Sequence, residues 1–377
     1  MSSTTRRTLL LAAAGTLAAP GLAVAQSRDP IRIGAVGPYS GNAAAFGLSM
    51  REAVDLVVDQ RNRAGGLLGR RIELMHGDDA GRPEEAANIS RRFANRDRVS
   101  LVLGSVSSPA SLAAAQVLRD EEVAQITISA TAQRITRQGN QWVFRSAVPD
   151  RKLVSDLVDF IAEKYPNHRR FGFLYVNDDF GKGGFDSFAE FGRARGFTIT
   201  AEERYSRGDI DFTAQLTRIR ASQPDAMVDW SRYAEGALIL RQVRQMQLGL
   251  QIYGSDGVAP PAYLELAGEA ANGVIYATHF SPATATGPEA AQFMAAIRQA
   301  YNKQADMTHA QAFDAANIAC DAIVRARSSE RRPVRDAIRQ TDFTSVRGPF
   351  RYDEFGDPTL ATHVVRVVNG RETNARA

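Results

Sequence analysis

A serine-rich turn at residues 104–111 contains the side chains of this sequence whose types and spacing suggest chemistry. It reads Gly-Ser-Val-Ser-Ser-Pro-Ala-Ser and follows the apolar run Val99 to Leu103. A strand, a turn of small residues and a helix together present free backbone N–H groups to an anion. Ser107 and Ser108 add hydroxyl groups, and Pro109 suits the first turn of a helix. The turn is therefore a candidate carboxylate site, although serine caps of ordinary helices are far commoner than anion sites.

Further candidate site residues share one position, because each follows a predicted strand. These are Phe46, Ser129, Ala130 and Thr131 in the first half of the chain, and Phe180, Trp230, Tyr233 and Asp256 in the second. Ligands of parallel α/β sheets bind beyond the carboxyl ends of the strands, so we expect these residues to converge on one crevice. Each also has a simpler interpretation: the aromatic residues as core, Thr131 as a cap and Asp256 as the acid of an Asx turn.

The types of these residues predict a ligand that carries charge. Ser108 and Thr131 offer two hydroxyls to a carboxylate in a desolvated pocket. An unpaired Asp256 carboxylate in a closed cleft is costly, so a cation of the ligand or a contact with Arg232 must offset that cost. Trp230 and Tyr233 could stack on a flat ligand or face a cation.

The sequence lacks the motifs of several other functions. The five histidines show no metal-ligand spacing, and the adjacent Asp178 and Asp179 have no His or Cys close by in the sequence. No Gly-x-Ser-x-Gly elbow, Gly-x-Gly-x-x-Gly pattern or P-loop occurs. We therefore expect a binding protein without metal or cofactor, rather than an enzyme with a nucleophile–base pair.

The elements that must position these residues alternate between strand and helix. Of the 377 residues, 44% are hydrophobic and 23% charged, which is ordinary for a globular protein with a sizeable core. The alternation predicts parallel sheets covered by helices on both faces. One series occupies residues 29–147 and a second occupies residues 148–277, and the length of the chain also favours two domains.

The last part of the chain is richer in helices. We expect residues 278–347 to return to the first lobe and residues 348–377 to return to the second. The chain would then cross between lobes near Val148, Thr278 and Gly348. Multiple crossings make a hinge that bends without letting the lobes tumble. The expected fold is therefore α/β, with two Rossmann-like lobes joined by a multi-crossing hinge.

The N-terminus has the pattern of an export signal. Arg6 and Arg7 precede an apolar run, and Ala23-Val-Ala25 supplies small residues before Gln26. The adjacent arginines resemble the twin-arginine class, although such pairs also occur in ordinary export signals. We expect residues 1–25 to be a cleaved signal peptide and the mature protein to be soluble and periplasmic. Cleavage lowers the formal charge from +4 to +2, because only the two arginines are lost.

The charge distribution, the single cysteine and the hydropathy of the chain argue against nucleic-acid binding, an intrachain disulfide and a membrane span. Positive residues are scattered rather than clustered, so nucleic-acid binding is not implied. Cys320 is the single cysteine and lies in an apolar helical run, which excludes an intrachain disulfide and predicts a buried structural thiol. No later run is apolar and long enough to span a membrane.

An ordered set of short motifs resembles a known family. The motifs are Ile33-Gly-Ala-Val-Gly-Pro-Tyr-Ser-Gly41, Gly65-Gly-Leu-Leu-Gly69, Gly77-Asp-Asp79, Gly104-Ser-Val-Ser-Ser108, Ser129-Ala-Thr131, Asp178-Asp-Phe-Gly181 and Gly254-Ser-Asp-Gly257. Together they resemble the periplasmic branched-chain amino acid (Leu/Ile/Val)-type solute-binding proteins of ABC importers. The resemblance covers residues 31–368. It implies two lobes that close around a small molecule and deliver it to a permease in the inner membrane.

The resemblance also implies roles for single residues. Ser108 and Thr131 match positions that hold a ligand carboxylate. Ala130 matches a residue whose carbonyl accepts from a ligand ammonium, and Asp256 matches an acid that neutralises this ammonium from the other lobe. The neighbouring Ser107 and Ser129 complete the expected site on the first lobe, and we expect the protein to act as a monomer.

Some positions keep the family pattern and others depart from it. Phe46 and Phe180 match aromatic positions that line the cleft. Asp256 is one methylene shorter than the glutamate of amino-acid binders, and Trp230 and Arg232 replace the usual glycines. The ligand therefore stays open between an amino acid, an aromatic or other carboxylate, and an amide-like solute. A sensory ligand-binding protein is the alternative to a component of an importer.

Overall fold

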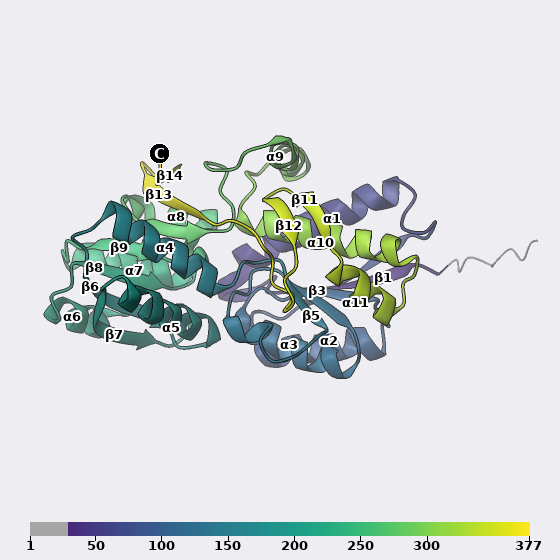
Figure 1. The fold of residues 1–377 in the computed structure, drawn as a ribbon, viewed down its shortest axis with the longest axis horizontal. Coiled ribbons are helices and arrows are strands. Elements are labelled where there is room, and N and C mark those ends of the chain that lie inside the picture. Colours follow the sequence, from purple (N-terminus) through teal and green to yellow (C-terminus); the bar gives the residue numbers. More distant parts are fainter. Residues whose placement is uncertain (1–28) are drawn as a thin grey trace, which may run out of the picture.

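The computed structural model describes residues 29–377, and the expected signal peptide lies outside this range. Two lobes lie side by side along the longest axis of the molecule (Figure 1). Each lobe contains a mainly parallel sheet with helices packed against it, which confirms the expected α/β fold. Hydrophobic residues fill the space between sheet and helices in both lobes.

Lobe 1 has the strand order β2-β1-β3-β4-β5, and all its neighbouring strands are parallel. Its strands are β1 (Ile31–Gly37), β2 (Ile72–Asp78), β3 (Leu101–Gly104), β4 (Ala124–Thr127) and β5 (Val143–Arg145). The two faces of β1 belong to different layers. Ile31 and Ile33 pack in the cluster that includes α1 (Ala44–Arg63), whereas Val36 packs with α2 (Pro83–Asn95) and α3 (Ser108–Asp120). Burial on both faces explains why the inner strand β3 is entirely apolar, whereas the edge strand β2 carries polar residues.

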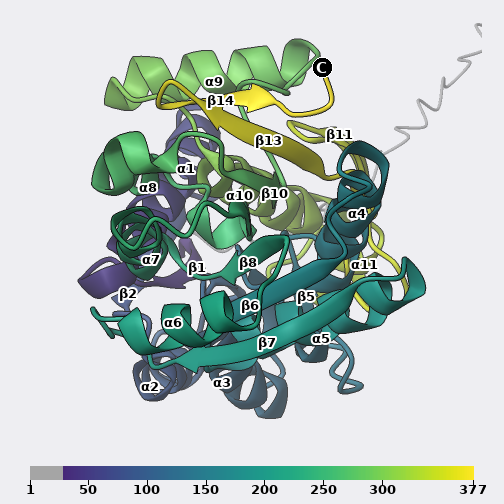
Figure 2. The ribbon, with the colours of Figure 1, turned by 90° about the vertical axis from the view of Figure 1, so that its left-hand side faces the viewer.

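Lobe 2 has the strand order β14-β13-β10-β9-β8-β6-β7 and is seen from its outer side in Figure 2. The parallel strands are β6 (Arg170–Val176), β7 (Thr198–Tyr205), β8 (Ala226–Trp230), β9 (Gln251–Gly254) and β10 (Ile275–Thr278). The antiparallel strands β13 (His363–Val368) and β14 (Arg371–Asn374) extend this sheet beside β10. The helices of the lobe are α4 (Asp150–Lys164), α5 (Asp179–Ala194), α6 (Thr213–Ala221), α7 (Tyr233–Gln245) and α8 (Pro261–Ala267).

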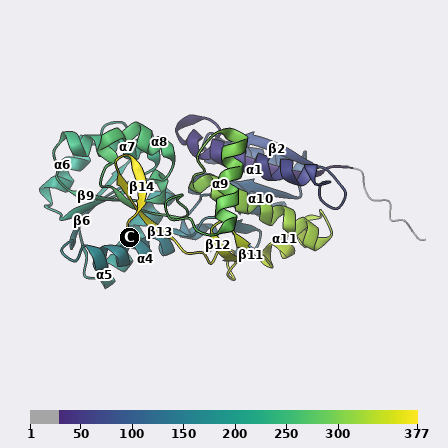
Figure 3. The same cartoon turned by 90° about the horizontal axis from the view of Figure 1, so that it is seen from above.

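After β10 the chain returns to lobe 1. The returning elements are α9 (Pro288–Tyr301), α10 (Met307–Ala326), α11 (Arg331–Arg339), β11 (Asp342–Ser345) and β12 (Gly348–Arg351). Figure 3 shows α10 alongside α1, and the two helices pack closely against each other. Helix α9 is joined to α1 by a hydrogen bond of 2.7 Å from the Tyr301 hydroxyl to the Glu52 carbonyl oxygen.

The third crossing lies further along the chain than Gly348, where we expected it. Strand β12 begins at Gly348 and pairs with β11, so it stays with lobe 1. Asp357 also stays there, because its Oδ1 lies 2.6 Å from the Nε atom of the buried Arg145. Thr362 then donates a hydrogen bond of 2.5 Å to a carboxylate of α4, so the chain crosses just before this residue. The Arg145–Asp357 ion pair therefore holds residues 348–357 in lobe 1.

Two local expectations concern the membrane and the cysteine. Within residues 29–377, no helix has the length and apolar character needed to cross a bilayer. Cys320 lies in α10 and is 1% exposed, as predicted. Burial raises the pKa of its thiol to about 12, so the group is neutral and unreactive.

Candidate functional site

A cavity between the lobes brings together residues from strand ends in both sheets. The predicted site residues in its wall are Phe46, Ser107, Ser108, Ser129, Phe180 and Asp256. The remaining wall consists of Ala43, Val106, Arg232 and Gly257. The cavity has a volume of about 20 Å³, which is room for little more than one water molecule. The lobes are therefore closed on each other in this structure.

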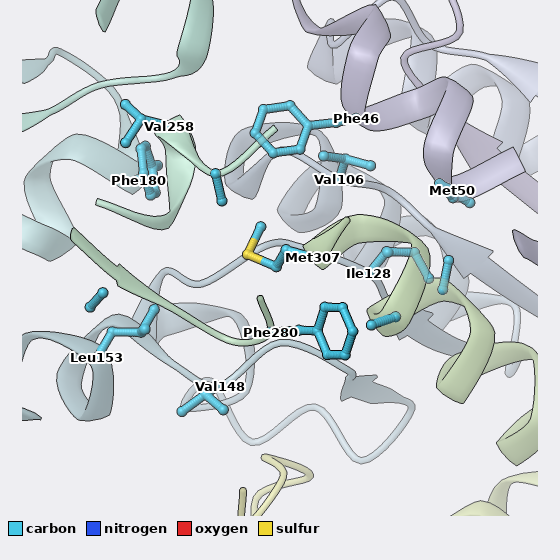
Figure 4. Close-up of a cluster of buried hydrophobic side chains, with 14 of the residues drawn as sticks. Phe46, Met50, Val106, Ile128, Val148, Leu153, Phe180, Val258, Phe280 and Met307 are labelled. Carbon is cyan, nitrogen blue, oxygen red and sulfur yellow. The ribbon is translucent and has the colours of Figure 1, made fainter. Parts of the chain in front are cut away.

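Aromatic side chains from the two lobes meet at this cavity. Phe46 of α1 and Phe180 of α5 both line the cavity, and Figure 4 shows them with the neighbouring apolar side chains Val106 and Val258. Tyr233 begins α7 of lobe 2, and its ring centroid lies 5.6 Å from that of Phe46. Its hydroxyl accepts a hydrogen bond of 3.3 Å from the Ala45 N–H of lobe 1. Tyr233 thus joins the lobes beside the cavity, but it is not part of the cavity wall.

The first turn of α3 forms one end of the cavity and is suited to an anion. Ser107 is the N-cap of the helix, and its hydroxyl oxygen accepts from the N–H three residues later at 3.4 Å. Ser108 Oγ accepts from the Ala132 N–H at 3.2 Å, and an accepting hydroxyl still has its own proton to donate. The helix dipole adds a partial positive charge. Gly104 makes the turn possible, because a Cβ atom there would lie 1.8 Å from the Val36 carbonyl oxygen.

The residues after β4 occupy different depths. Ser129 lines the cavity, and its hydroxyl donates a hydrogen bond of 2.5 Å to Gln311 Oε1 of α10. Ala130 is fully buried, and its carbonyl oxygen already accepts from Arg145 Nη1 at 3.4 Å. Thr131 is fully buried and does not line the cavity. The hydrogen bond from Arg145 leaves one lone pair of the Ala130 carbonyl oxygen, so its contact with a ligand stays a prediction.

Trp230 is a core residue of lobe 2, contrary to the expectation that it faces a ligand. It is fully buried at the end of β8, 6.1 Å from the ring of Phe180 and 6.4 Å from that of Phe173. The indole packs against Gly184 of α5, where a Cβ atom would lie 2.1 Å from Trp230 Nε1. Trp230 thus packs against Phe180, and Phe180 is the one of these two aromatic residues that lines the cavity.

Asp256 forms the end of the cavity on lobe 2. It starts the 3-10 turn η3 (Asp256–Val258) directly after β9 and is 3% exposed. Its neighbour Gly257 lies so close to the chain that a Cβ atom would be 2.2 Å from the Ser231 carbonyl oxygen. Asp256 Oδ2 lies 3.1 Å from His279 Nε2. Asp256 Oδ1 has no hydrogen-bond partner among the described residues.

His279 links this acid to the hinge and was not singled out from the sequence. It follows β10 at the second crossing, and its Nδ1 accepts a hydrogen bond of 3.0 Å from the Val148 N–H at the first crossing. An accepting Nδ1 places the proton of a neutral imidazole on Nε2, which donates to Asp256. Burial lowers the pKa of His279, so the ring is neutral and leaves the charge of Asp256 uncompensated.

Arg232 lines the cavity but is paired with another acid. Its Nη1 lies 2.8 Å from Asp178 Oδ2, and its guanidinium lies 5.0 Å from the Phe180 ring centroid. Burial disfavours the charge of Arg232, but Asp178 outweighs that effect and the pKa of Arg232 is raised. The contact between Arg232 and Asp256 that we considered from the sequence is therefore not formed.

The two adjacent acids before α5 point to different partners. Asp178 caps the helix by accepting from the N–H groups of Phe180 and Gly181. Asp179 binds Arg134 Nη1 of lobe 1 at 2.7 Å. In the part of the chain that the structure describes, no group of three or more His, Cys, Asp or Glu side chains is arranged to hold a metal ion.

Asp150 is a further acid near the site that sequence reasoning missed. It is the first residue of α4 and is fully buried. Burial and the charge of Asp256 raise the pKa of Asp150 well above its ordinary value. The available signal was its position, since it follows β5 after a short connection, as the other candidates follow their strands.

Comparison with known proteins places this arrangement in a family. A family model described as a periplasmic binding protein matches residues 30–372. The chain belongs to the periplasmic binding protein family. Proteins of this family bind small molecules for transport. The two lobes and the cavity between them in this periplasmic binding protein are the structure expected for such binding.

Curated relatives cover most of this periplasmic binding protein. The Leu/Ile/Val-binding protein BraC3 of Rhizobium johnstonii is 29% identical over 333 residues, which are 87% of this chain and 89% of that protein. The leucine-, isoleucine-, valine-, threonine- and alanine-binding protein of Pseudomonas aeruginosa is 28% identical over 329 residues, 87% of each chain.

Solved structures match an even larger share of this chain than the curated relatives do. The leucine binding protein LivK from Thermotoga maritima has a TM-score of 0.87 and 29% identity, covering 91% of this chain and 97% of that chain. A solute binding protein from R. palustris in complex with benzoate has a TM-score of 0.85 and 20% identity, covering 92% of this chain and 96% of that chain. At this identity the second similarity shows the fold alone.

Proposed function

We propose that this protein captures an amino acid between its lobes and delivers it to the permease of an ABC importer in the inner membrane. The observation that carries the proposal is the opposite character of the two ends of one cavity. Ser107 and Ser108 at the first turn of α3 form one end, and Asp256 with an unpaired oxygen forms the other. A carboxylate fits the first end and an ammonium fits the second. The similar leucine-, isoleucine- and valine-binding proteins support this ligand class.

Closure of the lobes is the binding step in this proposal. A ligand touches Ser108 and Asp256 together only when the lobes are closed, so it stabilises that state by its differential affinity. A cavity of about 20 Å³ is smaller than any amino acid, so the lobes must part before the ligand can reach it. The hinge of three crossing segments permits such a motion.

A thermal-shift screen tests the proposed ligand class. Leucine, isoleucine, valine, threonine, alanine and phenylalanine are compared with benzoate and with 4-methylpentanoate, which is leucine without its ammonium group. We expect at least one amino acid to raise the melting temperature by mass action, and 4-methylpentanoate to have no effect. A shift with benzoate alone would contradict the amino-acid assignment, and the absence of any shift would overturn the proposed function.

Aromatic carboxylates are a second candidate ligand class, favoured by Phe46 and Phe180 in the wall of the cavity. Flat rings stack well on such side chains. An aromatic carboxylate without further polar groups, such as benzoate, however, has no donor for the unpaired oxygen of Asp256. Because burying an unpaired carboxylate is costly, we favour the amino acid.

We further propose that the protein is an exported monomer that releases its ligand unchanged. The basic pair and apolar run in residues 1–25 support export with cleavage after Ala25, and the adjacent arginines resemble the twin-arginine class. N-terminal sequencing of the exported protein tests the cleavage, and light scattering tests the monomer. Recovery of the bound amino acid without chemical change would support a binding protein, and its turnover would contradict one.

A further inference from the structure

Asp150 stands where the chain first crosses between the lobes. It begins α4 just after Val148, and its N–H donates a hydrogen bond of 2.9 Å to the Thr131 carbonyl oxygen of lobe 1. Its side chain also lies against the first turns of α5, because a Cβ atom at Gly183 would be 2.8 Å from Asp150 Oδ2. Phe180, from the same part of α5, lines the cavity. Asp150 therefore lies on the hinge side of the site, behind the residues that line the cavity, and contacts elements of both lobes.

Several oxygen atoms around this position are buried without a hydrogen bond. Among the described residues, Asp150 Oδ1 and Oδ2, Thr131 Oγ1 and Asp256 Oδ1 have no partner of normal geometry. Asp150 and Thr131 are fully buried, and Asp256 is 3% exposed. Native proteins rarely leave buried polar groups unpaired, so each such group calls for an explanation. Carboxylate oxygens only accept, and the group that satisfies them must be a donor.

The charged groups that face Asp150 do not supply this donor. They are Arg145 of β5, Asp178 before α5 and Asp256 of η3. Arg145 is engaged elsewhere, since its Nε lies 2.6 Å from Asp357 Oδ1 and its Nη atoms bond to lobe 1 oxygen atoms. Asp178 is paired with an arginine of its own lobe, as described above. The positive charge that faces Asp150 is thus that of Arg145, which is already paired with Asp357.

We propose that Asp150 is a specificity-determining residue of the ligand site, which shares the N–H donors of a ligand ammonium with Asp256 and Thr131. This inference rests on the proposed function and identifies the group that completes the acidic end of the cavity. An ammonium has three N–H donors and no acceptor, which suits a set made of two carboxylates and a hydroxyl. A plain carboxylate ligand has no such donor and would leave both acids unpaired. The site thereby selects amino acids over plain carboxylates.

Amino-acid binding is expected to change the protonation of Asp150. Without a cation beside it, burial and the charge of Asp256 raise the pKa of Asp150. A ligand ammonium favours the ionised carboxylate and lowers that pKa again. Binding of an amino acid is then coupled to proton release from Asp150 at pH values between its pKa in the bound and in the free protein.

Titration calorimetry in buffers of different ionisation enthalpy measures both the affinity and the proton count. Leucine, isoleucine, valine, threonine and alanine are titrated separately. We expect Asp150→Asn to weaken the binding of each active amino acid by at least about tenfold and to abolish the proton release. Asp159→Asn is the matched control, because Asp159 lies on the same helix with a side chain 47% exposed and pairs with Arg195. The control keeps the affinity and the proton release of the wild type.

The melting temperature of the ligand-free protein separates a ligand role from a structural one. Asp150→Asn removes a buried acid that has no partner, so we expect the variant to unfold at or above the temperature of the wild type. Asp150→Ser serves as a second variant with the same expectation. A lower melting temperature together with unchanged affinity would mean that Asp150 is structural, and it would overturn the inference.

The outcomes for this inference and for the proposed function are distinguishable. If the wild type binds an amino acid and both Asp150 variants bind it equally well, the inference fails and the proposed function stands. If the wild type binds none of the amino acids, both fail. If benzoate binds and no amino acid does, Asp150 does not receive an ammonium, and only the capture of a small carboxylate remains.

Discussion

Ser108 contributes a hydroxyl at the end of the cavity where the ligand carboxylate is proposed to bind. Replacing it by alanine removes a hydrogen bond to a charged group, which is worth roughly 1.5–3 kcal/mol. We therefore expect Ser108→Ala to weaken amino-acid binding by that amount in titration calorimetry. Ser111→Ala is the control, because Ser111 lies one turn later on α3, buried with an unpaired hydroxyl outside the cavity wall. Equal affinities for the two variants would remove the α3 turn from the ligand site.

Phe180 and Trp230 show how far residue type predicts a role. Both are aromatic, both follow a strand of lobe 2, and both were candidate ligand contacts. Only Phe180 lines the cavity, because the indole of Trp230 fills the space left by the missing side chain of Gly184. That space is created by the packing of α5 on β8, which no local pattern reports. The sequence therefore predicted that both aromatic residues lie near the site, but it could not predict which of the two lines the cavity.

Helix α10 is fixed to α1 by an ionic network at its first turn. The His309 ring lies between Asp306 Oδ1, 2.9 Å from its Nδ1, and Glu52 Oε2, 3.0 Å from its Nε2. Burial opposes the charge of the ring, but the two acids outweigh it and raise the pKa of His309 to about 9. The protonated ring therefore stabilises the folded state below the unfolded-state pKa of about 6.5, and this contribution is lost as the pH rises through 9.

Urea denaturation across this pH window checks the network. We expect the free energy of unfolding to fall by up to about 3 kcal/mol between pH 6.5 and pH 9, and His309→Gln to flatten this dependence. His168→Gln is the control, because burial lowers the pKa of His168, so its titration lies below this window. A wild-type profile that is flat from pH 6.5 to pH 9 would contradict a charged His309.

At the scale of the whole molecule, closure is held by contacts that exist only between the lobes. Arg207 of lobe 2 donates a hydrogen bond of 2.5 Å to the Gly81 carbonyl oxygen of lobe 1. It does not line the cavity, so its removal acts on the equilibrium between open and closed states rather than on the ligand. We expect Arg207→Ala to weaken ligand binding by about 1 kcal/mol, or about fivefold.

X-ray scattering of the ligand-free protein gives the second measurement for this variant. The radius of gyration of Arg207→Ala should exceed that of the wild type, and ligand should restore it. Arg204→Ala is the control, because Arg204 is 58% exposed and its distance of 3.9 Å to Glu202 makes only a weak ion pair within lobe 2. The same radius and affinity in all three proteins would mean that this contact has no influence on closure.

The sequence by itself determined the two-lobed fold, the strand ends that carry the site and the serine-rich turn at α3, because periodicity, caps and turns are local properties. It did not determine which acids are neutralised, since that depends on pairs distant in sequence, such as Asp357 with Arg145 and Asp178 with Arg232. Only the tertiary structure placed Asp150 next to Thr131 and left the side-chain oxygens of both without a hydrogen bond of normal geometry. The physical reason is that charge compensation is decided by what packs nearby, and packing of the two lobes joins residues from every part of the chain.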